Sequence, residues 1–84
     1  MSTHAMQAPA KYLVVIDAAG EMLARMFDAQ RKLIADFDAS SSEVAVMTQG
    51  LVPQRGADDP AWDAALGGHS ASERAQAEVY LLDV

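Results

Sequence analysis

A three-residue pattern, an apolar residue followed by Asp and Ala, recurs in the first half of the chain and restricts the possible folds more than any other feature. It stands at residues 16–18, 27–29 and 37–39, at spacings of eleven and ten, and Leu82 with Asp83 repeats its first two positions. Asp is a common turn residue, so strands that end in Asp at regular intervals are typical of a β-meander. The pattern therefore predicts three consecutive strands joined by short turns.

The first of these strands is predicted at Tyr12–Ile16, a β-branched and aromatic run that is closed by Asp17. Both sets of alternating side chains in this run are apolar. A strand with two apolar faces needs cover on each side, so we expect it in the centre of the sheet rather than at an edge.

One long helix at about residues 19–37 is the alternative, which would give a β-α-β-α-β order. Seven residues follow the 3.6-residue spacing of one helical face, of which only Gln30 is polar: Leu23, Met26, Phe27, Gln30, Leu33, Ile34 and Phe37. Against the helix, Gly20 would fall in its first turn, where Gly costs up to about 1 kcal/mol relative to Ala. We favour the meander, whose weak point is a second turn at residues 29–31 without Gly, Pro or Asn.

The second half of the chain predicts two short helices and a returning strand. Ser40–Glu43 supplies a helix start that can run to Gly50, and Asp59 with Pro60 starts a second short helix that contains Trp62 and ends before Gly67.

A capping box at Ser70–Glu73 then starts another turn or two, and Val79–Leu82 reads as a strand that returns to the sheet. The expected class is α+β, a small antiparallel β-β-β sheet followed by two short helices and a C-terminal strand.

The length of 84 residues indicates one domain, for which we expect a flexible leader at 1–10 and a single folded unit at 11–84. The chain contains no cysteine, which excludes disulfides and thiolate metal sites and fits a reducing compartment. The first residues lack a secretory signal, and no apolar run is long enough to cross a membrane. We therefore expect a cytoplasmic protein.

The net charge of −6 argues against two classes of partner. Lys and Arg clusters supply most of the affinity for phosphate backbones and for anionic membrane surfaces, and the chain has no such cluster. We therefore expect neither a nucleic-acid partner nor a membrane partner.

Candidate chemical groups all have a simpler structural interpretation. Asp17 and Asp38 at strand ends, with His69, could form a metal or acid/base site, but Asp there is expected to form turns. The serines of Ser40–Ser42 are expected to cap a helix, and His4 falls in the leader. No catalytic, cofactor-binding or metal-binding residue is predicted, and we expect no enzymatic activity.

Contacts with a protein partner are predicted at two places. The third strand carries Ile34 on its wetter side, with Leu33, Ala35 and Phe37 on the drier one, and only Lys32 and Asp36 protect its edge. Trp62 would anchor a partner if it were half-buried.

The function expected is a small acidic interaction or accessory domain that binds another protein or forms a homodimer. Two other classes stay open: a ligand-binding or enzymatic site formed at a dimer interface, and an acidic inhibitor that mimics nucleic acid.

Overall fold

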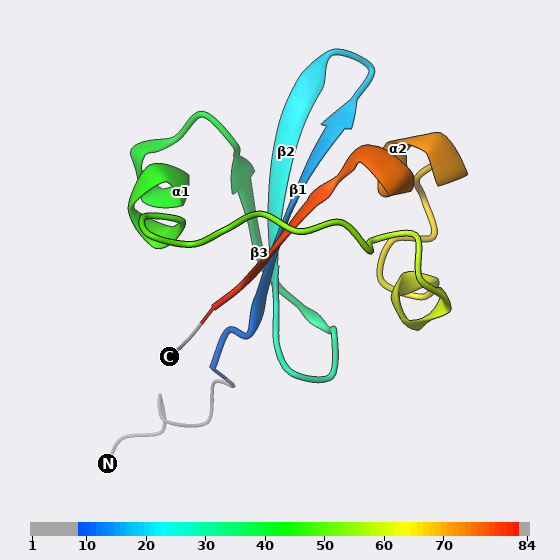
Figure 1. The fold of residues 1–84 in the computed structure, drawn as a ribbon, viewed down its shortest axis with the longest axis horizontal. Helices are drawn as coiled ribbons and strands as arrows, with labels where there is room; N and C mark the ends of the chain where they lie inside the picture. Colours follow the sequence, from blue (N-terminus) through cyan, green and yellow to red (C-terminus); the bar gives the residue numbers. More distant parts are fainter. Residues whose placement is uncertain (1–8, 83–84) are drawn as a thin grey trace.

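Figure 1 shows the ribbon of a computed structural model of the protein, which describes residues 9–82. The elements are β1 Tyr12–Ala18, β2 Glu21–Phe27, β3 Leu33–Asp38, α1 Ser42–Met47, the 3-10 helix η2 Pro60–Trp62, α2 Ala71–Gln76 and β4 Glu78–Leu81. The predicted leader, including His4, lies outside the described residues except for its last two positions. None of the helices within residues 9–82 has the length and apolar character needed to cross a membrane.

The four strands form one antiparallel sheet in the order β3-β2-β1-β4. This arrangement confirms the predicted α+β class, the meander and the returning strand, which begins one residue earlier than expected. It also confirms the interior position of β1. The alternative of one long helix at about residues 19–37 is wrong, because these residues form β2, a turn and most of β3.

The first turn shows why the strand pattern prevails over the helical one. Ala19 and Gly20 join β1 to β2, and both have positive φ angles, 55° and 85°. A two-residue loop with positive φ at both positions is a type I′ turn, whose twist matches that of a hairpin. Gly adopts this conformation without a steric penalty, so the residue that would weaken a helix closes a hairpin instead.

The second turn uses a side chain where Gly or Asn is usual. The carboxylate of Asp28 accepts hydrogen bonds from the backbone N–H groups of Gln30 and Lys32, both at 2.9 Å. The backbone N–H of Asp28 donates to the carbonyl of Lys32, which closes a three-residue loop. Arg31 takes the left-handed position of this loop with φ 63°.

A β-bulge follows this turn and changes the facing of one residue. Phe27 pairs with Leu33 and Met26 pairs with Ala35, so Ile34 is the extra residue of β3. Ala35 and Phe37 stay on the drier face as predicted, but Leu33 is moved to the opposite face and is 54% exposed. The prediction for Leu33 was wrong because strict alternation does not hold across a bulge.

Two apolar layers cover the two faces of the sheet. The first, the Trp62 layer, contains Val14, Ile16, Phe27, Ala57, Trp62, Leu66 and Ala77. The second, the Val44 layer, contains Leu13, Val15, Ala24, Val44 and Leu82. Figure 1 shows α1 on one side of the strands and α2 on the other. Because β1 contributes to both layers, it has cover on each face, as its sequence predicts.

The helix starts confirm the predicted caps. The hydroxyl of Ser41 accepts from the N–H of Val44, and Ser70 with Glu73 forms the capping box of α2. Asp59 caps η2, which corresponds to the predicted second short helix, by accepting from the N–H of Ala61 at 2.8 Å. That helix is shorter than expected: η2 ends at Trp62, and irregular turns follow it to Gly68.

Candidate functional site

The two edges of the sheet differ in how far they are covered. Beside β4, Gln54 forms an isolated bridge with Val79, in which the two N–H to carbonyl distances are 2.9 and 2.8 Å. Beside β3, no other strand of the described chain pairs with the outer edge. The predicted edge position of the third strand is therefore confirmed.

The backbone of Asp36 points away from the sheet. The N–H of Ala39 donates to the carbonyl of Met22 at 3.2 Å, which continues the register of β2 and β3. In an antiparallel ladder, hydrogen-bonded pairs alternate, so Phe37 and Ala35 face β2, whereas Asp36 directs its N–H and C=O outward. The carbonyl of Asp38 is already used, because it accepts the N–H of Ser41 at 2.9 Å.

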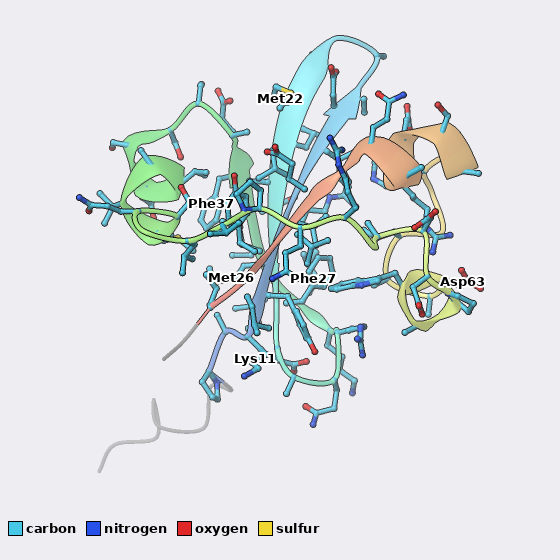
Figure 2. The ribbon with its side chains drawn as sticks, viewed as in Figure 1. Lys11, Met22, Met26, Phe27, Phe37 and Asp63 are labelled. Atoms are coloured by element: carbon cyan, nitrogen blue, oxygen red, sulfur yellow. The ribbon has the colours of Figure 1, made fainter. Side chains whose placement is uncertain are left out.

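Most polar side chains near this edge are exposed, and their charges are unevenly distributed along it. Arg31 and Lys32 precede β3, whereas Asp36 and Asp38 lie in its second half. Figure 2 shows Phe37 on the α1 side of the sheet, where it packs against the Val44 layer, whereas the β3 side chains of the opposite face, Leu33, Asp36 and Asp38, are exposed. Leu33 adds an exposed apolar side chain at the start of the strand.

Of the four predicted contact residues, the structure places three together. Lys32 directly precedes β3, and Ile34 and Asp36 lie on this edge strand. Lys32 and Asp36 are exposed, and Ile34 is half-buried. Their contact with a partner stays a prediction.

Trp62 lies elsewhere, in the core. Its side chain is 4% exposed, and its ring packs edge-on against Tyr12 at 5.2 Å and Phe27 at 5.1 Å between centroids. The role of partner anchor was predicted on condition that the indole is half-buried, and this condition is not met in the single chain. What the geometry shows for Trp62 is packing between β1, β2 and η2.

The acidic residues at strand ends do not converge. Asp38 lies opposite Leu23, which lies opposite Ile16, so Asp38 is on the face of the Trp62 layer. Asp17 lies two residues after Val15 on the same strand, so it shares the face of the Val44 layer. Within residues 9–82, no three His, Cys, Asp or Glu side chains are grouped closely enough to hold a metal ion.

Asp38 instead forms the turn that its position predicts. Its carboxylate accepts from the backbone N–H of Ser40 at 3.1 Å and from the Ser40 hydroxyl at 2.9 Å. These two bonds, the backbone one first, hold the pKa of Asp38 below its ordinary value.

His69 is held at the start of α2. Its Nδ1 lies 3.3 Å from Oε1 of Glu73, the residue that also closes the capping box. The imidazole therefore contributes to the start of α2. Within residues 9–82, its side-chain hydrogen bond is to Glu73, and it forms none with a Ser hydroxyl that could act as a nucleophile.

One group of residues was missed by the sequence analysis. A cavity of about 200 Å³ is lined by Arg31, Gln54, Arg55, Gly56, Asp59, Trp62 and Val79. Arg31 and Arg55 come from two distant loops, so no local motif joins them. The single sequence signal was the second turn, whose lack of Gly, Pro or Asn requires another residue to adopt a positive φ.

Comparison with known proteins adds no family to this description. No family model matches the sequence, and neither the curated proteins nor the solved structures include a match.

Proposed function

We propose that the protein is a small interaction domain, without catalytic activity of its own, that pairs with a second copy of itself along β3. The open outer edge of β3 carries this proposal. An unpaired edge with outward N–H and C=O groups is a template for another strand, and Asp36 supplies both groups. The absence of cysteine supports a cytoplasmic location for such a domain.

The charge pattern of β3 favours a copy of the same strand as its partner. The basic residue Lys32 stands directly before its start, and acidic residues, Asp36 and Asp38, stand in its second half. Antiparallel pairing brings the basic start of one strand beside the acidic end of the other. Parallel pairing would place like charges together, which is unfavourable.

Self-association can be measured by sedimentation equilibrium over a wide range of protein concentration. The expected mass rises from that of one chain, 8.9 kDa, toward that of two chains. A mass that stays at one chain up to millimolar protein would contradict the proposal.

Two sets of variants locate the contact. Asp36→Pro removes an N–H that points away from β2, and Pro is tolerated on edge strands, so the variant is expected to keep the sheet but lose the dimer. Lys32→Glu is expected to weaken the dimer, and Lys32→Glu with Asp36→Lys is expected to restore it because the charges are again complementary. If both charge variants associate like the unchanged protein, the contact is not along β3.

A further inference from the structure

Arg31 occupies a position where its residue type is costly. Its φ of 63° lies in the left-handed region, which costs a side chain with a Cβ about 1 kcal/mol or more. The guanidinium carbon then lies 5.0 Å from the centroids of both the Tyr12 and Trp62 rings. The two aromatic rings therefore fix the guanidinium in one place.

The charge of Arg31 has no counter-ion in the described chain. Within residues 9–82, the ion pairs within 4.0 Å are those of His69 with Glu73 and of Arg74 with Asp63. The Nε of Arg31 is buried without a hydrogen-bond partner. The buried Nε distinguishes Arg31 from the other cations, because a buried polar group normally has a hydrogen-bond partner.

A second arginine, Arg55, lines the cavity described above. The Nη1 of Arg55 donates to the backbone carbonyl of Gln76, and the neighbouring Gln54 is tied to β4 through both of its backbone groups. Arg31 and Arg55 both line this cavity, together with the apolar residues Trp62 and Val79.

We infer that this cavity binds an oxyanion, the phosphate or carboxylate group of a small ligand, between Arg31 and Arg55. A planar guanidinium can donate two parallel hydrogen bonds to the two oxygens of such a group. A second guanidinium adds positive charge that attracts the anion. The size of the cavity, about 200 Å³, admits the anionic group and a small attached skeleton.

Asp59 also lines the cavity and limits the affinity for an anion. Its Oδ1 accepts from the N–H of Ala61, so the carboxylate is held by the cap of η2. The negative charge of Asp59 repels a bound anion, so a variant without this charge is a suitable control. Asp59→Asn keeps a good N-cap side chain but removes the charge.

The experiment is a titration of the isotope-labelled protein with inorganic phosphate and, separately, with acetate, followed by NMR at constant ionic strength. The expected result is a saturable shift of the amide signals of residues 54–56 and of the Trp62 indole N–H. Saturation by phosphate alone assigns a phosphorylated ligand, and saturation by acetate assigns a carboxylate ligand.

The variants distinguish a built site from general attraction. Arg55→Gln and Arg31→Asn, where Asn tolerates a positive φ, should each weaken binding at least about tenfold, as expected for the loss of a charge-assisted hydrogen bond. Asp59→Asn should bind the anion more tightly than the unchanged protein. The absence of a saturable shift with both anions, or equal affinities in both arginine variants and the unchanged protein, overturns the inference.

Discussion

Three Asp side chains hold two turns and one helix start of this protein by hydrogen bonds to nearby backbone groups. Asp28 replaces the missing Gly of the second turn by accepting two backbone N–H bonds, Asp38 holds the turn after β3, and Asp59 caps η2. Each of these bonds joins residues no more than four apart. Their formation therefore depends on local sequence, which is why the turn at Asp38 and the cap at Asp59 are predicted correctly from the sequence.

Asp38 makes the pH dependence of one turn testable. Its folded-state pKa lies below the ordinary value of 3.8, so it favours the folded state at pH values above that value. This contribution is lost as the pH falls through the folded-state pKa. A ¹³C NMR titration of the Asp38 carboxyl carbon is expected to give a midpoint below 3.8.

The cause of this shift can be checked with a neighbouring residue. Ser40→Ala removes the hydroxyl but keeps the backbone N–H, which is the larger cause, so the Asp38 midpoint should move only part of the way back. A midpoint at or above 3.8 in the unchanged protein would show that the turn does not hold the carboxylate.

Other residues could not be placed from the sequence. Leu33 was expected on the drier face, but its facing depends on a bulge at Ile34 that no local signal marks. Arg31 and Arg55 meet at one cavity only because the loop after α1 runs back past β4. Such contacts follow from tertiary packing, which single-sequence patterns do not contain.

At the scale of elements, the repeat of apolar residue, Asp and Ala predicted the meander because strand ends and turns are local features. The competing helical spacing was also real: Leu23, Met26 and Phe27 would share one face of a helix. In the sheet, Leu23 and Phe27 share one face and Met26 lies on the other. The choice between the two structures depends on the hairpin at Ala19 and Gly20 and on the two layers that cover the sheet.

The first hairpin gives a prediction at this scale. Gly20→Ala places a Cβ at φ +85°, where no other atom lies within 4 Å, so its cost is conformational alone. We expect a loss of about 1–2 kcal/mol in the free energy of unfolding, measured by urea denaturation. Gly68→Ala is the matched control, because it also meets no atom within 4 Å but has no positive φ.

The comparison of the two glycine variants separates backbone conformation from packing. Gly68→Ala is expected to change the free energy of unfolding by less than about 0.5 kcal/mol, as surface substitutions usually do. Equal losses in the two variants would mean that the turn conformation does not contribute to the stability of the hairpin.

At the scale of the whole molecule, the four-stranded sheet lies between the Trp62 layer and the Val44 layer. Trp62 is the largest side chain in these two layers. It joins η2 to β1 and β2 by contacts with Tyr12 and Phe27. Trp62→Ala is expected to lower the free energy of unfolding by about 3–5 kcal/mol, because it leaves a large cavity. For a small domain this is a large share of the total of about 5–15 kcal/mol.

The loss in Trp62→Ala can be measured by urea denaturation followed by circular dichroism. Val46→Ala is a suitable control, since Val46 lies on α1 and is 70% exposed, and it should change stability by less than about 0.5 kcal/mol. A loss below about 1 kcal/mol in Trp62→Ala would contradict the placement of the indole in a packed core.

The pairing of the last strand with the first brings distant parts of the chain to one place. The backbone N–H of Leu82 donates to the carbonyl of Lys11 at 2.8 Å, so the start of β1 and the residue after β4 are neighbours. A domain whose entry and exit lie side by side can be inserted into a surface loop of a host protein without forcing the two sides of that loop apart. The close approach of residues 11 and 82 therefore suits insertion of this fold within another chain as well as fusion at its end.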